Sequence, residues 1–378
     1  MVNSKKISTL AVLTEHNFYT MENRYCIIMS GGVGSRFWPF SRTSCPKQFL
    51  DFFGMGRTLL QMTYDRISHI IPAENIYIVT NEEYADITYQ QLPEVSHSNI
   101  LLESQRRNTA PCIAWASYHI RKLNPQAVML VAPCDHIIFR EDEFARTIER
   151  GFEFVRHNNR LLTIGIPPKR PETGYGYIQV SDTCTDGVCN VKTFVEKPDD
   201  DMARVLVESG EFLWNSGMFL WNVHTIIDAL EKHLPDIATL FEKASDSILT
   251  AHEKEAIDKV YERCLTISVD FGIMEQTSNA CVICADLGWS DLGTWSGLYE
   301  ISPKTETGNV TQRCKTMLYD STNNLVAVKG DKLVVLDGLN DYLVAESENV
   351  LLICPRENEK RIRQFVNDAK VKFDGKYN

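Results

Sequence analysis

A glycine-rich run follows a short apolar segment in the first part of the chain. Residues 25–29 have the composition of a buried strand, and Gly31, Gly32 and Gly34 come directly after them. Glycines at this point let backbone N–H groups approach an anion, because no Cβ atom stands in the way. The run then delivers Arg36, whose forked guanidinium suits bidentate contact with a phosphate. The chemistry that this pattern predicts is the binding of phosphate groups.

Two familiar phosphate-binding fingerprints do not match this run. A dinucleotide-binding loop needs a third glycine where this chain has Phe37, and a Walker loop needs a Gly-Lys-Ser/Thr sequence that does not follow here. A second cation, Lys47, comes eleven residues after Arg36 and directly follows the rigid Pro46. Arg36 and Lys47 together favour a phosphate site over a simple glycine turn.

The segments that must position these residues alternate between short apolar runs and amphipathic stretches. Because strands that alternate with helices indicate βαβ crossovers, we expect an α/β fold with a Rossmann-like, mostly parallel sheet flanked by helices. In such sheets, ligands bind beyond the carboxyl ends of the strands. The strands are expected at 25–29, 75–80, 99–102, 127–132 and 161–166, and the helices at 58–70, 82–92, 109–123 and 141–157.

The pattern of the chain changes after Gly308, where short apolar pieces alternate with turn residues. We expect a small C-terminal β domain there, closed by a helix at 357–367. A short left-handed β-helix is one form of such a domain, although no fixed-period repeat supports it. The expected organisation is a loosely ordered extension over 1–20, a main domain over 21–307 and the β extension over 308–378.

Composition argues against several classes of protein. The 378 residues carry 39 basic and 50 acidic side chains, and the net charge of −11 argues against a nucleic-acid-binding surface. No apolar run reaches about 18 residues, so a membrane span is not expected. Residues 1–20 lack the long apolar core and the cleavage site of a signal peptide, and Met21 is a more natural start.

The eleven cysteines are scattered without the spacing of a disulfide framework. Cys281 and Cys284 form the only Cys-x-x-Cys sequence, and no second pair accompanies them to complete a zinc site. We therefore expect reduced thiols in the core and a cytoplasmic protein.

Seven segments of the chain resemble, in order, the motifs of the sugar-nucleotide pyrophosphorylases, and specifically of the mannose-1-phosphate guanylyltransferases. The first is the glycine run with Pro46-Lys47-Gln48-Phe49, and the resemblance extends over about residues 25–300. Cys134 departs from the family, which usually has a smaller residue at this position. The other segments are 108–111, 132–136, 173–178, 195–198, 214–218 and 289–295.

The resemblance implies the transfer of GMP from GTP to α-D-mannose 1-phosphate, which yields GDP-mannose and pyrophosphate. The attacking phosphate oxygen is already ionised at neutral pH, so the reaction needs no catalytic base. It needs cations that reduce the repulsion between two polyanions and stabilise the departing pyrophosphate. The catalytic residues that the resemblance indicates are Arg36, Lys47 and Lys197.

Two aspartates are the expected metal ligands. Asp135 follows the strand expected at 127–132, and Asp291 lies in the loop after an apolar run at 281–287. Two hard carboxylates suit Mg²⁺, which prefers few protein ligands. Because Asp135 and Asp291 lie in two of the family motifs, we interpret them as magnesium ligands rather than as capping residues. The expected cofactor is Mg²⁺.

The resemblance also assigns residues to the two substrates. Glu196 can accept hydrogen bonds from sugar hydroxyls, and Lys197 can neutralise the 1-phosphate. Guanine as the base is implied by the resemblance alone. The nucleotide-binding residues are Gly31, Gly32, Gly34, Arg36, Lys47, Asn108 and Thr109, and the sugar-phosphate-binding residues are Gly174, Glu196, Lys197 and Asn215.

Two alternatives to this function remain open from the sequence. One is a nucleotidyltransferase for another sugar 1-phosphate, of the GDP-heptose or glucose-1-phosphate type, and the other is a regulatory subunit that binds sugar nucleotides without turnover. The presence of Arg36, Lys47, Asp135 and Asp291 favours an enzyme. The expected partners are GTP and mannose 1-phosphate, with no nucleic acid and no membrane. The sequence allows a homodimer without fixing the oligomeric state.

Overall fold

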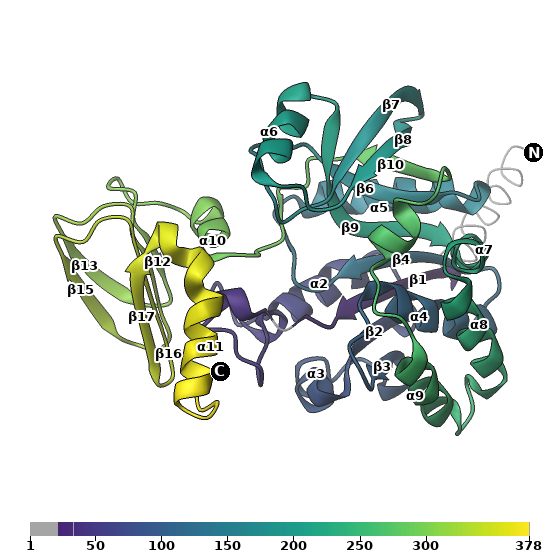
Figure 1. Cartoon of the computed structure of the whole chain (residues 1–378), viewed down its shortest axis with the longest axis horizontal. Coiled ribbons are helices and arrows are strands. Elements are labelled where there is room, and N and C mark those ends of the chain that lie inside the picture. Colours follow the sequence, from purple (N-terminus) through teal and green to yellow (C-terminus); the bar gives the residue numbers. More distant parts are fainter. Residues whose placement is uncertain (1–21, 33, 378) are drawn as a thin grey trace, which may run out of the picture. The chain divides into compact units, whose positions relative to one another are not determined.

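The computed structural model of the chain describes residues 22–32 and 34–377. The extension predicted at 1–20, and Met21 beside it, lie outside the described residues. The chain divides into two compact units (Figure 1). The described part of unit 1 comprises residues 22–31, Tyr64–Pro133 and Ile138–Trp289, and that of unit 2 comprises residues 32, 34–63, Cys134–Ile137 and 290–377. This division differs from the boundary expected at residue 307, which stays a prediction.

A nine-stranded sheet forms the centre of unit 1 (Figure 1). Its strands are β1 (Arg24–Ser30), β2 (Ile76–Asn81), β3 (Ile100–Glu103), β4 (Val128–Pro133), β6 (Leu161–Ile166), β7 (Tyr177–Thr185), β8 (Val188–Val195), β9 (Phe212–Asn222) and β10 (Ala280–Cys284). They are arranged in the order β3-β2-β1-β4-β9-β6-β10-β8-β7. The five strands expected from the apolar runs are β1, β2, β3, β4 and β6.

The directions of these strands confirm an α/β fold and refine one feature of it. β3, β2, β1 and β4 run parallel, as expected of βαβ crossovers. β9, however, runs antiparallel to β4 and β6, and β8 runs antiparallel to β7 and β10. Although β6 and β10 again run parallel to each other, the sheet is therefore mixed rather than parallel throughout. One cause is the tight turn between β7 and β8, where Asp186 and Gly187 both have positive φ and force a hairpin.

Helices cover both faces of this sheet. Phe219 and Trp221 of β9 belong to the large core cluster under one group of helices. Leu220, which alternates with them, points to the other face, where it packs with Leu162 against Gly151. The helices are α3 (Ala85–Gln91), α4 (Thr109–Leu123), α5 (Glu141–His157), α6 (Asp200–Ser209), α7 (Val223–His233), α8 (Pro235–Ala244) and α9 (Glu253–Arg263), and α2 (Leu59–Ser68) continues from unit 2 into unit 1.

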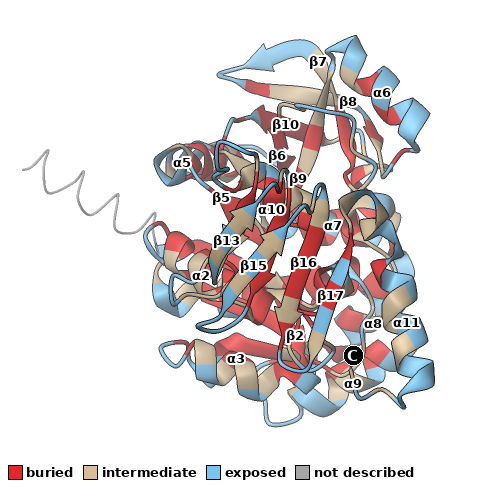
Figure 2. Cartoon of the chain, turned by 90° about the vertical axis from the view of Figure 1, so that its left-hand side faces the viewer, coloured by how far each residue is buried: buried red, intermediate tan, exposed pale blue. Residues whose placement is uncertain are grey.

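Short strands with parallel pairing dominate the C-terminal part of unit 2. β16 is mostly buried, whereas exposed residues recur along β13 and β15 (Figure 2). β12, β14 and β16 pair in parallel, β17 adds to β16 in the antiparallel direction, and β13 pairs in parallel with β15. The left-handed winding of this region stays a prediction. The elements are α10 (Trp295–Ile301), β12 (Val310–Gln312), β13 (Lys315–Tyr319), β14 (Leu325–Val328), β15 (Leu333–Asp337), β16 (Tyr342–Ser347), β17 (Val350–Pro355) and α11 (Ile362–Lys372). Two further strands of two residues each, β5 (Ile137–Ile138) and β11 (Trp289–Ser290), pair with each other in a separate sheet.

Aromatic residues form the core of unit 2 around the segment that follows the glycine run. Phe37 is fully buried, and its ring meets the edge of Phe52 at 4.7 Å and of Trp295 at 5.1 Å between centroids. Phe40 contacts Trp295 as well, at 5.2 Å. The residue that breaks the dinucleotide fingerprint is therefore a core anchor that fixes the course of the chain beside Arg36.

Two cysteines correct the expectation of reduced thiols. Cys184 and Cys189 form a disulfide across the hairpin of β7 and β8, where they lie directly opposite each other with a Cα–Cα distance of 4.0 Å. Cys281 is buried and free, and Cys284 is exposed and free. Within residues 22–32 and 34–377, no helix has both the length and the apolar character needed to cross a membrane.

Candidate active site

Three of the predicted site residues meet at the ammonium group of Lys47 in unit 2. Lys47 begins the short helix η2 (Lys47–Phe49) directly after Pro46, whose ring fixes the entry of the chain. Its Nζ lies 2.9 Å from Oδ2 of Asp135, and it donates to the carbonyl oxygens of Asp291 (3.0 Å) and Leu292 (3.2 Å). One cation thus holds both predicted metal-binding segments.

The charge of Lys47 governs the ionisation of Asp135. Burial alone would raise the pKa of this carboxyl, but the charge of Lys47, the nearby His136 and the hydrogen bond from Lys47 outweigh it, and the pKa is lowered. Only 12% of the Lys47 side chain and 24% of the Asp135 side chain are exposed, so bulk water screens this pair incompletely. Asp135 is therefore held as an anion.

The glycine run is braced by the segment that carries Lys47. Gly34 has a φ of 61°, and a Cβ atom there would lie 2.9 Å from Cβ and Cγ of Lys47, so no other residue fits without a shift. Gln48 donates from Nε2 to the carbonyl of Gly32 at 2.9 Å, and Ser41 donates from its hydroxyl to the carbonyl of Gly34. Arg36 is exposed and makes no hydrogen bond or ion pair with another described residue. Its guanidinium is therefore available to a ligand.

The backbone beside Asp291 is strained. Leu292 has a φ of 43° although it is a fully buried leucine, and such conformations persist only where the surroundings fix them. Oδ1 of Asp291 accepts from the backbone N–H of Gly293 at 3.0 Å. Both carbonyls that bind Lys47 belong to this turn. The strained backbone is therefore the segment whose carbonyl oxygens bind the ammonium group of Lys47.

The donors near Lys47 fit a magnesium ion. Within residues 22–32 and 34–377, no group of three or more His, Cys, Asp or Glu side chains is arranged to hold a metal. Mg²⁺ does not require one, because it usually binds through one or two carboxylates and completes its shell with water and substrate phosphates. Asp135 and Asp291 offer hard anionic oxygens of this kind, and Lys47 already places a cation against Asp135.

A second cluster of predicted residues lies in unit 1, after β8 and within β9. Lys197, which has a φ of 47°, forms an ion pair with Glu196. A Cβ atom on Gly176 would come within 2.7 Å of Oε2 of Glu196 and 3.7 Å of Nδ2 of Asn215. Glu196, Lys197 and Asn215 are therefore neighbours, and their contact with a sugar phosphate stays a prediction. Gly174, in contrast, binds Glu172 through its N–H at 3.3 Å, and the glycine that this cluster requires is Gly176.

Two acids of this cluster were missed in the sequence. Asp270 begins the short π-helix η7 (Asp270–Met274) and accepts from Nδ2 of Asn215 at 2.7 Å. Burial and the charge of Glu196 raise the pKa of Asp270 to about 6, while Asn215 and Lys197 act in the opposite direction. Glu275 accepts from the backbone N–H of Glu196 at 3.1 Å. Neither acid follows an expected strand, so the rule that directs attention to strand ends could not find them.

Asn108 and Thr109, the predicted nucleotide-binding residues of unit 1, use their side chains to bind backbone N–H groups in this structure. Asn108 has a φ of 68°, and its side chain caps α4 by accepting from the N–H of Thr109 at 2.9 Å. The hydroxyl of Thr109 accepts from the N–H of Val269 at 2.9 Å. These bonds fix the segment but leave its nucleotide contacts a prediction.

Glu103, at the end of β3, is a further polar residue missed in the sequence. Its Oε1 accepts from the hydroxyl of Tyr261 at 2.7 Å, and its Oε2 lies 3.8 Å from the position of a Cβ atom on Gly31. Burial raises the pKa of Glu103 to about 7, although Tyr261 and Arg106 lower it. Its position at the carboxyl end of a parallel strand is the signal that could have found it.

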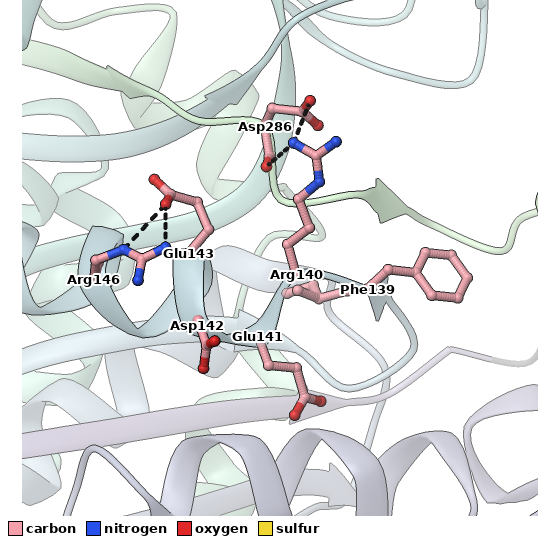
Figure 3. A pocket seen from close by; sticks show the side chains of 8 residues that line it. Phe139, Arg140, Glu141, Asp142, Glu143, Arg146 and Asp286 are labelled. Atoms are coloured by element: carbon pink, nitrogen blue, oxygen red, sulfur yellow. Dashed lines mark hydrogen bonds and ion pairs between the residues drawn. The ribbon is translucent and has the colours of Figure 1, made fainter.

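A hollow of about 780 Å³ in unit 1 contains none of the predicted site residues (Figure 3). Both arginines that line it are paired with acids of the same hollow, because Arg140 binds Asp286 at 2.8 Å and Arg146 binds Glu143 at 2.9 Å. Phe139 is exposed at its rim. The polar clusters around Lys47 and Asn215 are therefore better candidates for the chemistry.

Comparison with known proteins identifies the family to which the chain belongs. Residues 25–308 match the family model of the nucleotidyl transferases. Mannose-1-phosphate guanylyltransferase 2 of Escherichia coli O157:H7 is 34% identical over 93% of this chain and 74% of its own length, and the mannose-1-phosphate guanylyltransferase of Escherichia coli K12 is 37% identical over the same shares. A crystal structure from Thermus thermophilus, described as mannose-1-phosphate geranyltransferase, has a TM-score of 0.83 at 25% identity and covers 92% of this chain and 99% of its own. The chain therefore belongs to the mannose-1-phosphate guanylyltransferase family of nucleotidyl transferases.

Proposed function

We propose that the chain transfers GMP from GTP to α-D-mannose 1-phosphate and releases GDP-mannose and pyrophosphate. The observation that carries this proposal is the convergence of the Asp135 carboxylate and the Asp291 and Leu292 carbonyls on the ammonium of Lys47. An ammonium between two aspartate-bearing segments suits the positioning and charge neutralisation that phosphoryl transfer requires. Relatives named for this activity support the choice of substrates.

The sugar phosphate supplies the nucleophile in this reaction. One of its ionised oxygens attacks the α-phosphorus of GTP, the bond from that phosphorus to the bridging oxygen of the β-phosphate breaks, and pyrophosphate leaves with the electron pair. Arg36 would contact the β- and γ-phosphates, and Lys47 would offset their charge near Asp135. The glycines of the run would present backbone N–H groups to the same phosphates.

Asp135 and Asp291 would hold Mg²⁺. When bound, the ion supplies neutralisation of negative charge on the phosphate oxygens. Lys47 keeps Asp135 ionised before any ion arrives, because it lowers the pKa of this carboxyl. This chain therefore maintains an anionic ligand for the metal across the neutral pH range.

The cluster of unit 1 would bind the acceptor. Lys197 would neutralise the phosphate of mannose 1-phosphate, while Glu196 and Asn215 would bind its hydroxyls. Gly176 permits the close approach of Glu196, which any side chain at that position would disturb. Gly174 would contribute through its backbone.

Glu103 would select guanine, with Asn108 and Thr109 supporting the base. The Watson–Crick edge of guanine presents the N1 and N2 N–H groups side by side, and an ionised carboxylate can accept from both. Glu103 is buried, and its Oε2 is directed towards Gly31 of the glycine run. Adenine and uracil do not offer this pair of donors, so the carboxylate would favour GTP over ATP and UTP.

Two further proposals concern assembly and architecture. Val310, Leu325 and Leu343 are successive partners in parallel strands, fifteen and eighteen residues apart, which supports a short left-handed β-helix in the predicted extension over 308–378. The homodimer is retained as a proposal. Light scattering of the purified protein over a range of concentrations would test it, and a single monomer mass at all concentrations would contradict it.

The decisive experiment measures pyrophosphate release across a matrix of nucleotides and sugar 1-phosphates with Mg²⁺ present. We expect GTP with mannose 1-phosphate to give the highest kcat/KM. Equal rates with glucose 1-phosphate or a heptose 1-phosphate would favour the alternative sugar, and binding without turnover of any pair would favour a regulatory subunit. Asp135→Asn should abolish most of the activity, whereas Asp337→Asn, a matched change at an exposed position of β15, should not.

A further inference from the structure

Backbone hydrogen bonds hold the segment that leads to Asp270 in place. The residues before it are bonded to the segment that opens α4: the N–H of Ile267 donates to the carbonyl of Arg107 at 3.2 Å, and its carbonyl accepts from Ala110 at 3.1 Å. The N–H of Val269 donates to Thr109. The carboxylate of Asp270 is therefore presented from a rigid backbone.

The amide of Asn215 has one possible orientation in this environment. Its Oδ1 accepts from the N–H of Gly217 at 3.1 Å, which fixes the oxygen side of the amide. The hydroxyl of Thr163 lies 3.2 Å from the same oxygen and shares its single hydrogen with the carbonyl of Met218 at 3.1 Å. Its Nδ2 donates one hydrogen to Asp270 at 2.7 Å. The second N–H of this nitrogen remains for another acceptor, and Nδ2 lies close to Gly176, beside Glu196.

The electrostatic setting of Asp270 is unfavourable for a purely structural acid. The carboxylates of Glu196 and Glu275 lie in the same cluster, and Lys197 is the cation that acts on Asp270 there. Burial and Glu196 raise the pKa of Asp270 to about 6. A neutral acceptor would orient Asn215 at a lower cost in stability, and perturbed acids of this kind concentrate at functional sites.

We propose that Asp270 is a positioning residue of the acceptor site, which acts by fixing the amide of Asn215 so that its second N–H and the carboxylate of Glu196 together receive hydroxyl groups of the hexose. The inference rests on the proposed function, because it takes this cluster as the sugar-phosphate site. It adds a residue that neither contacts the reacting phosphates nor belongs to a motif identified in the sequence. Asp270 determines which way the amide points, and so which hydroxyl is bound.

The test compares Asp270→Ala, Asp270→Ser and Asp270→Asn with Glu211→Gln as a control. Glu211 also accepts from a side-chain amide at 2.7 Å, that of Gln179, but away from this cluster. The dissociation constant of mannose 1-phosphate is measured on enzyme that already holds a non-reactive GTP analogue. We expect it to rise about tenfold in Asp270→Ala and Asp270→Ser. Asp270→Asn retains a carbonyl acceptor for Asn215 and should remain within about threefold of the wild type.

A second measurement separates positioning from a general loss of structure. The four monodeoxy analogues of mannose 1-phosphate, lacking the hydroxyl at C2, C3, C4 or C6, are bound to the wild type and to Asp270→Ser. At one position, the losses from the deoxy analogue and from the substitution should not add, because both remove the same hydrogen bond. Additive losses at all four positions, or weakened GTP binding equal to that of the sugar phosphate, would overturn the inference.

The outcomes for the wild type test the proposed function separately. If the wild type fails to bind mannose 1-phosphate, the function itself is wrong. If the wild type binds it and Asp270→Ala and Asp270→Ser bind it equally well, only the role of Asp270 is wrong. Thermal unfolding of each variant checks that the protein is folded, and Asp270→Ser keeps a polar side chain in case the alanine variant is unstable.

Discussion

The contact between Gly34 and Lys47 yields a prediction that separates two physical effects. Gly34→Ala introduces a Cβ atom at a φ of 61° and at 2.9 Å from Cβ and Cγ of Lys47. The left-handed backbone costs an L-residue about 1–2 kcal/mol. The overlap with the stem of Lys47 adds about 1–3 kcal/mol, because these atoms lie near the backbone and cannot swing aside. We expect a total loss of about 2–5 kcal/mol in the free energy of unfolding.

Two other glycines of unit 2 serve as matched controls. Gly56 has a φ of 79° with no atom within 4 Å of its Cβ position, so Gly56→Ala should show the backbone cost alone. Gly32 has open space and no positive φ, so Gly32→Ala should change stability by less than about 0.5 kcal/mol. Gly32→Ala therefore shows neither cost, Gly56→Ala shows the backbone cost alone, and Gly34→Ala shows the backbone cost together with the overlap.

The measurements are thermal unfolding and pyrophosphate release. Each 1 kcal/mol should shift Tm by about 2–8 °C, so Gly34→Ala should melt well below Gly56→Ala. Its turnover should also fall by about a hundredfold, because displacement of Lys47 by even an ångström disturbs its bonds to Asp135 and Asp291. Equal melting of Gly34→Ala and Gly56→Ala would refute the tight contact. Normal turnover in a destabilised Gly34→Ala would refute the need for the observed position of Lys47.

Three further predictions concern charge. Asp135→Asn should lower kcat by at least about a hundredfold, measured by pyrophosphate release at saturating Mg²⁺, and near-normal turnover would contradict its role as a ligand. Arg36→Ala should weaken GTP binding, and Lys197→Ala should weaken mannose 1-phosphate binding, each by roughly 10- to 150-fold in calorimetry, while equal damage to both ligands would contradict separate sites. Because the raised pKa of Glu103 is about 7, GTP affinity should fall as the pH drops through 7 and the carboxylate becomes protonated, and Glu103→Gln should remove this dependence. A wild-type affinity that stays constant from pH 8 to 6 would exclude Glu103 from base recognition.

Periodicity predicts the strands of this fold better than their directions. The apolar runs at β1, β2, β3, β4 and β6 carry an unambiguous local signal, and they are confirmed. The direction of β9 depends on its partners β4 and β6, which are far away in the sequence. No local pattern encodes that choice, so the reversal of β9 that makes the sheet mixed could not be predicted from the sequence.

The candidate site shows the same limit. Lys47, Asp135 and Asp291 could be grouped because each lies in a motif, and their contact is visible in the structure. Asp270 could not be found, because its significance comes from Asn215 and Glu196, which lie on other elements. A functional role that depends on contacts between residues far apart in the sequence can be recognised only in the folded structure.

The division of unit 2 into separate stretches of chain has a consequence for synthesis on the ribosome. Phe37 and Phe52 belong to a segment that ends at residue 63, whereas their partner Trp295 emerges more than two hundred residues later. At a rate of protein synthesis of about 5–20 residues per second, Phe37 and Phe52 leave the ribosome roughly 10–50 s before Trp295. During that interval, chaperones can reach apolar surface that the finished protein hides. Lys47 and its glycine run are therefore encoded early but acquire their final environment among the last parts of the nascent polypeptide.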